Sequence, residues 1–132
     1  MSEKRYYYLK LKENFFETDE MVVLENMENG KEYSIILLKM YLRSLKDEGK
    51  LMIRKLIPYT PESLACVLRH DVRVVEQAIE VFEKLGLIEK LDSGAIFMTD
   101  IQNFIGESST DADRKRAYRE RIRREKEAQQ DG

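Results

Sequence analysis

The densest group of chemically active side chains in this sequence is a basic run near its end. Residues 114–126 hold eight basic and two acidic side chains, whereas the whole chain of 132 residues holds 23 basic and 25 acidic ones. Such a run suits sequence-independent contact with phosphates, and a tyrosine ring within it could stack on a base. A solvated helix stabilised by ion pairs is the alternative. The DNA-contacting residues predicted in this segment are Arg114, Lys115, Arg116, Tyr118, Arg119, Arg121, Arg123, Arg124 and Lys126.

Candidates for catalysis are weaker. The single histidine, His70, stands beside Asp71, and a His/Asp pair can activate a nucleophile. No serine or cysteine motif accompanies the pair, so a surface or capping role is expected. Cys66 stands among apolar residues and is expected to be a small core residue. Because the glycines are scattered singly and no Cys/His spacing fits zinc, we expect no enzyme activity, no cofactor and no metal.

The first part of the chain predicts a short strand and two helices that would position these groups. Residues 6–12 begin as an aromatic run and end in apolar/polar alternation, which suits a short strand or an extended lead-in. A helix is expected from Thr18 or Asp19 to the pair Asn29-Gly30, interpreted as its C-cap. A central helix should then span residues 31–48. Its expected buried stripe is Leu37, Tyr41 and Leu45, with Ile35, Leu38 and Leu42 beside it.

The middle of the chain predicts a strand, two helices and a hairpin. Residues 51–57 are interpreted as one short strand. Thr60 followed by proline opens a helix over about residues 61–69, because proline is favoured at the first helical position. Asp71 caps a second helix, and Phe82 lies on its apolar face. Phe82 and Tyr41 are the bulky side chains expected in the core. Residues 87–99 should form a hairpin.

The order helix, strand, helix, helix, strand, strand is that of a winged helix-turn-helix. We therefore predict a mainly α fold with a small β wing, an α+β class, over residues 1–106. A basic arm over residues 107–132 should follow it, helical only under some conditions or disordered. The alternative is a bundle of four or five helices with an incidental hairpin.

The second helix of the predicted helix-turn-helix is the element that would read bases, yet its outward charges do not favour DNA. Its three carboxylates would repel phosphates along most of its length. One hypothesis is that only its N-terminal end contacts DNA, through Arg69, His70, Arg73 and Gln77. The other is that the helix is a protein-contact surface built on Glu76, Glu80 and Glu83.

Three separated segments resemble a known family. They are residues 4–16, KRYYYLKLKENFF, residues 42–51, LRSLKDEGKL, and residues 82–89, FEKLGLIE. In order and spacing they are similar to the N-terminal domain of phage replisome organiser proteins, which is related in architecture to the winged helix of the primosomal DnaD proteins. The resemblance implies replication initiation without catalysis, through binding at the phage origin and recruitment of host helicase-loading or primosome proteins.

Members of that family commonly continue beyond the basic segment, whereas this sequence ends at Gly132. We therefore expect either a shortened form or a short member that acts mainly through its winged helix and arm. We expect a cytoplasmic DNA-binding protein without a membrane span. A second copy of the chain, in a homo-oligomer, is a further candidate partner. The alternatives are an oligomerisation or adaptor module that contacts host replication proteins without binding DNA, and a phage transcriptional regulator.

Overall fold

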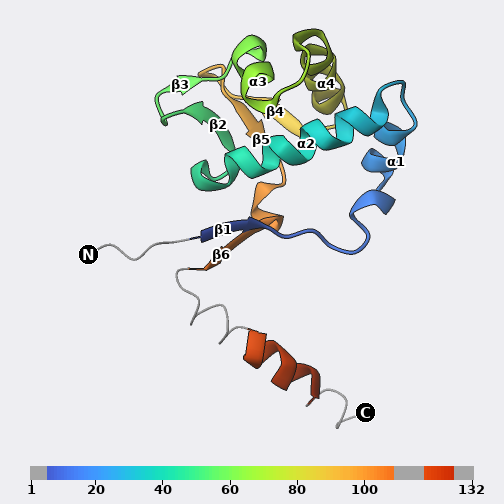
Figure 1. Cartoon of the computed structure of the whole chain (residues 1–132), viewed down its shortest axis with the longest axis vertical. Helices are drawn as coiled ribbons and strands as arrows, with labels where there is room; N and C mark the ends of the chain where they lie inside the picture. The colour runs from blue at the N-terminus through green and yellow to red at the C-terminus, as the bar shows by residue number, and fades with distance from the viewer. Residues whose placement is uncertain (1–5, 109–117, 127–132) are drawn as a thin grey trace. The chain divides into compact units, whose positions relative to one another are not determined.

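The structure, a computed structural model, describes residues 6–108 and 118–126 (Figure 1). These residues belong to two compact units. The larger unit is Leu9–Ile105, and the smaller contains residues 6–8, 106–108 and 118–126. Three of the predicted arm residues, Arg114, Lys115 and Arg116, lie outside the described residues.

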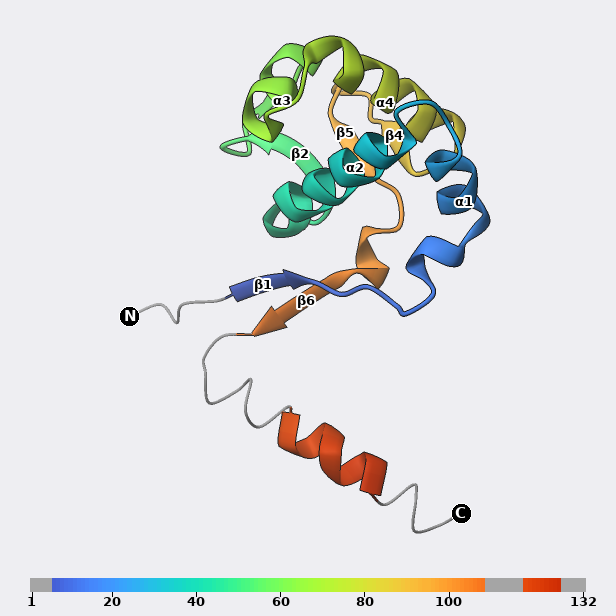
Figure 2. The ribbon, with the colours of Figure 1, turned by 45° about the vertical axis from the view of Figure 1, so that its right-hand side comes forward.

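The larger unit contains four α-helices arranged around one of them. The second helix is the longest and contacts the other three and two strands, which confirms its predicted central place (Figures 1 and 2). Within residues 6–108 and 118–126, no helix is long and apolar enough to cross a membrane. The helices are α1 (Asp19–Glu25), α2 (Gly30–Ser44), α3 (Pro61–Leu68) and α4 (Val72–Lys84).

Each unit also contains a small sheet. The sheet of the larger unit is antiparallel in the order β3-β2-β5-β4. The smaller unit's sheet pairs β1 with β6. The chain is therefore α+β, and a four-stranded sheet excludes the alternative of a helical bundle with an incidental hairpin. The strands are β1 (Tyr6–Leu9), β2 (Lys50–Ile53), β3 (Ile57–Pro58), β4 (Ile88–Lys90), β5 (Ile96–Met98) and β6 (Ile105–Ser108).

The core of the larger unit lies where α2 and α4 meet the sheet. The predicted α2 stripe of Leu37, Tyr41 and Leu45 is buried, and so is Phe82 on α4. Burial raises the pKa of the Tyr41 hydroxyl to about 12, and the nearby Asp100 carboxylate adds to the rise. Tyr41 packs on the ring of Phe104 with their centroids 4.8 Å apart. The predicted core faces of both helices are therefore confirmed at their centres.

The first helix ends earlier than predicted. It stops at Glu25 with Asn26 as its C-cap, and the pair Asn29-Gly30 begins α2 instead of closing α1. A Cβ on Gly30 would overlap the backbone oxygens of Leu24 and Glu25. Glycine is thus needed here because α2 begins against the end of α1, a tertiary reason that the local cap pattern does not reveal.

Three apolar side chains expected in or beside the core lie on the surface. Ile35 and Leu42 on α2 are exposed, whereas Ile36 and Met40 on the same helix are buried. Cys66 on α3 is exposed as well. An apolar residue next to a buried stripe can fall on either side of the boundary, and only the neighbouring elements decide where that boundary lies.

Residues 51–57 form a hairpin and not the single predicted strand. β2 ends at Ile53, the chain turns through Arg54 and Lys55, and it returns as β3. Both turn residues adopt left-handed backbone angles, with φ of 52° and 63°. Turns of this kind favour Asn, Asp and Gly, none of which is present, so the sequence carried no turn signal here.

Candidate nucleic-acid interface

The pair α3 and α4 is positioned by local hydrogen bonds that the sequence predicts. Thr60 caps α3, its hydroxyl accepting from the Ser63 amide at 3.1 Å, and Pro61 takes the first helical position. Asp71 caps α4 by accepting from the Arg73 amide at 2.9 Å. The caps define where each helix begins, and only residues 69–71 connect α3 to α4.

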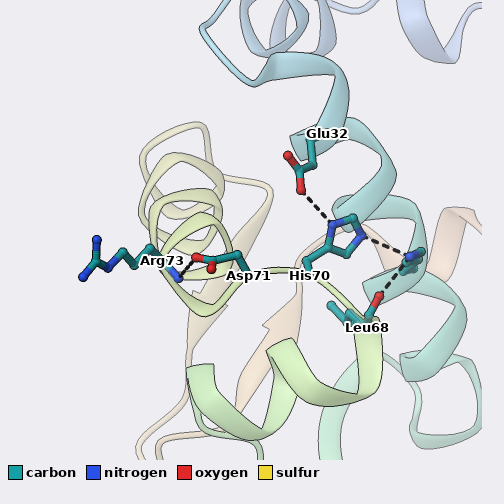
Figure 3. A network of polar contacts seen from close by, with 6 residues as sticks. Glu32, Leu68, His70, Asp71 and Arg73 are labelled. Carbon is teal, nitrogen blue, oxygen red and sulfur yellow. Dashed lines mark hydrogen bonds and ion pairs between the residues drawn. The ribbon is translucent and has the colours of Figure 1, made fainter.

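His70, in this connection, is held by α2 (Figure 3). Its Nδ1 lies 3.0 Å from Glu32 Oε1, and its Nε2 lies 3.0 Å from Lys39 Nζ. Lys39 Nζ also donates to the Leu68 carbonyl at 2.9 Å. Because an ammonium can only donate, Nε2 must accept, and Nδ1–H donates to Glu32. The His70 side chain is only 12% exposed.

These contacts divide the four residues predicted to read DNA at this connection. Both ring nitrogens of His70 are engaged with α2, and the Gln77 side-chain oxygen accepts from the Tyr33 hydroxyl at 3.2 Å. Arg69 and Arg73 are exposed. His70 is thus held against α2, whereas Gln77 is exposed like the two arginines and has only its side-chain oxygen engaged.

Replacing His70 by alanine should lower the free energy of unfolding by about 1–3 kcal/mol, because it leaves Glu32 and Lys39 without their shared partner. Urea denaturation followed by circular dichroism measures the loss. Glu32→Gln is the matched control, since the amide oxygen still accepts from Nδ1–H and should retain most of the stability. An unchanged midpoint in His70→Ala would show that the network does not hold the two elements together.

The outward face of α4 is acidic, as the sequence predicts. Glu76, Glu80 and Glu83 are all exposed. A single weak ion pair joins Glu83 to Lys90 of β4, with N and O 3.8 Å apart. An exposed pair at that distance neutralises little charge. The middle of α4 therefore presents carboxylates to any approaching phosphate.

In the smaller unit, residues 118–126 form a helix, here called the arm helix. The predicted pair of Glu120 and Arg124 is present at 2.9 Å. The Tyr118 side chain is 57% exposed, and the Arg121 guanidinium lies 5.6 Å from its ring centroid. The helix carries five basic and two acidic side chains, and all of its residues are exposed except Ile122, which is partly buried. Its exposed cations are Arg119, Arg121, Arg123, Arg124 and Lys126.

A second basic surface surrounds the β2–β3 hairpin, and no local sequence motif marks it. A hollow of about 330 Å³ there is lined by three lysines and two carboxylates. The signal that could have revealed it is the run of cations over residues 43–59. The hollow itself is formed by the 3₁₀ turn Leu45–Asp47, Glu48 and the hairpin. The hollow's lining residues are Lys46, Asp47, Glu48, Lys50, Met52 and Lys55.

Comparison with known proteins gives one match. The family model described as the N-terminal phage replisome organiser matches residues 8–127. The chain belongs to this family. A search of curated proteins and a search of solved structures each gave no match. The match runs from β1 through the arm helix, so the basic segment is part of the family domain, and membership supports a role in organising phage replication.

Proposed function

We propose that this replisome organiser domain is a non-catalytic DNA-binding protein that acts in the cytoplasm at the start of phage replication. It binds the phage origin, mainly through the arm helix, and recruits host helicase-loading or primosome proteins. The observation that carries the proposal is the exposed arm helix, with five basic side chains against two acidic ones inside a family domain of replication organisers.

The distribution of charge on the arm helix supports phosphate contact without base reading. At 100° per residue its cations point in several directions, so whichever side faces a duplex offers guanidinium groups to phosphates. The exposed ring of Tyr118, with Arg121 beside it, adds a surface on which an unpaired base can stack. These features suit both duplex and single-stranded DNA.

The larger unit adds orientation in this proposal. The elements α2, β2, α3, α4, β4 and β5 are interpreted as a winged helix of the DnaD type, in which α4 would approach the major groove. Only its N-terminal end suits DNA, because Arg69 and Arg73 are exposed there and carboxylates follow. The winged helix therefore contributes register, and the arm contributes most of the affinity.

The test is a fluorescence-anisotropy titration of the full chain onto a labelled random-sequence duplex and a labelled single strand of the same length. The proposal predicts saturable binding to at least one of them. Absence of binding to both would contradict DNA binding and favour a protein-contact role. Tighter binding to an origin fragment than to a promoter fragment would support a role in replication. Equal binding to both fragments would not distinguish that role from transcriptional regulation.

The acidic face of α4 favours a second candidate, an adaptor that contacts another copy of the chain or a host replication protein. In that case Glu76→Lys with Glu80→Lys should disrupt self-association or partner binding, because the change reverses the charge of the contact surface. Both side chains are exposed, so the change removes no core contact. Sedimentation velocity and pull-down with purified host primosome proteins measure the effect. Unchanged results in both assays would contradict the adaptor candidate.

A further inference from the structure

The turn between β2 and β3 exposes apolar side chains that nothing in the larger unit covers. Leu56 is 77% exposed and Ile57 is 59% exposed, the two highest values among the large apolar side chains of the described residues. The Leu56 amide donates to the Ile53 carbonyl at 2.9 Å, which closes the turn and directs the chain back into β3. In both ribbon views the turn lies at the margin of the unit, away from α4 and β4 (Figures 1 and 2).

The same region has a net positive charge, unlike the rest of residues 6–108. Residues 43–59 contain five basic and two acidic side chains, whereas the rest of residues 6–108 contains eight basic and sixteen acidic ones. The Lys55 ammonium lies 4.0 Å from Asp47 at the limit of an ion pair, with 78% of its side chain exposed. Such a pair neutralises little of its charge. The hairpin is thus a cationic site on an acidic unit.

The turn is also built from residues that do not favour its geometry. Arg54 and Lys55 both adopt left-handed backbone angles, which Asn and Gly reach with far less strain. Strain of this kind is concentrated at functional sites, where the side chain matters more than the ease of the turn. Here it places two cations directly before an exposed leucine.

We propose that the hairpin tip, residues 54–57, is a second DNA-contacting element that enters the minor groove. Leu56 would press against a base step, with Arg54 and Lys55 on the flanking phosphates and Lys46 and Lys50 behind them. Proteins that enter the minor groove combine these two features, cations for the phosphates and an apolar wedge that partly unstacks the bases and bends the duplex. This inference rests on the proposed function and deepens it.

Two observations favour DNA over a protein partner at this tip. Lysine is depleted in the centres of protein interfaces, whereas lysines line the hollow beside this turn. The outer strand β3 contains Pro58, which lacks the N–H that a partner strand would need for edge pairing. A protein contact here would therefore rest on Leu56 and Ile57, which lie among positive charges that are only weakly neutralised.

The first test replaces the strained pair by the residues that the turn prefers, Arg54→Asn with Lys55→Gly. This variant should fold at least as well as the wild-type chain, since it relieves two left-handed residues. It should bind a labelled duplex about tenfold more weakly, with a log–log salt slope shallower by about 2. The matched control, Lys84→Gln with Lys90→Gln, removes two cations that lie near the acidic residues of α4. It should change affinity by less than about twofold.

The second test reports on unstacking. A duplex containing 2-aminopurine should become more fluorescent when the full chain binds, because the fluorophore brightens when it loses its stacked neighbour. Leu56→Ala should lose that increase while affinity falls by less than about fivefold, and Leu56→Met should keep it, since methionine still fills the base step. No fluorescence increase with the wild-type chain would overturn the wedge.

The outcomes separate this inference from the proposed function. If the wild-type chain binds the duplex and Arg54→Asn with Lys55→Gly binds equally well, the hairpin is not a DNA contact and the proposed function stands. If the wild-type chain does not bind DNA, both fail. If the variant keeps DNA binding but loses a purified host replication protein in pull-down, the tip is a protein contact and the inference is overturned.

Discussion

Replacing Arg119, Arg121 and Arg123 by glutamate is expected to abolish retention of the full chain on DNA. All three side chains are exposed on the arm helix, so the change turns three phosphate contacts into repulsions without removing a core contact. Losing three charged contacts worth about 1 kcal/mol or more each already weakens binding by more than about 100-fold. Anisotropy titration measures the loss, and urea denaturation should show an unchanged midpoint for the larger unit.

The matched control is the same triple replacement by lysine, which keeps the charge. It should bind within about threefold of the wild-type chain if the contacts are with phosphates and not with base edges, because a lysine serves as a point charge. Binding retained in the glutamate variant would contradict the arm's leading role. Weight would then pass to the exposed Arg69 and Arg73 at the start of α4 and to the hairpin tip.

Phe82→Ala is expected to lower the free energy of unfolding by about 3–5 kcal/mol, the usual cost of removing a fully buried phenyl ring. Phe82 is 0% exposed on the inner face of α4. Urea denaturation should give a lower midpoint with an unchanged m-value. Glu76→Ala, on the opposite face of the same helix, should change stability by less than about 0.5 kcal/mol. A loss below about 1 kcal/mol for Phe82→Ala would contradict the packing described here.

The elements with strong local signals were predictable. Thr60 before Pro61 and Asp71 before α4 are caps whose side chains satisfy the first amides of a helix, and both act as expected. Gly86, with φ of 75°, directly follows the C-cap residue of α4. Gly94, with φ of 90°, lies in the turn between β4 and β5. Each of these caps and turns is determined by a few neighbouring residues, so the sequence alone was enough to predict it.

Two predictions failed because the residues that decide the structure are distant in the chain. Asn29-Gly30 looks like a C-cap, yet its glycine is required where α2 approaches α1. His70 finds its partners Glu32 and Lys39 on α2, more than thirty residues earlier, so its role could not be inferred from local pattern. The β2–β3 turn was missed for a different reason, because Arg54 and Lys55 do not favour the left-handed backbone angles that they adopt.

The candidate site divides in the same way. The basic composition of the arm and the acidic face of α4 were readable because charge can be counted in sequence. The predicted ion pair of Glu120 with Arg124 follows from helical spacing and is confirmed. The gathering of Lys46, Lys50 and Lys55 around one hollow depends on the hairpin, and so it became visible only in three dimensions.

The central claim, that cations of this chain bind DNA phosphates, is tested most directly by the salt dependence of binding. The full chain is titrated onto a labelled random-sequence duplex by anisotropy across a series of salt concentrations. Contact of about four arm cations with phosphates predicts a log–log slope of roughly −3 to −4, and steeper where the hairpin adds its own contacts. An affinity that barely changes with salt would contradict the account.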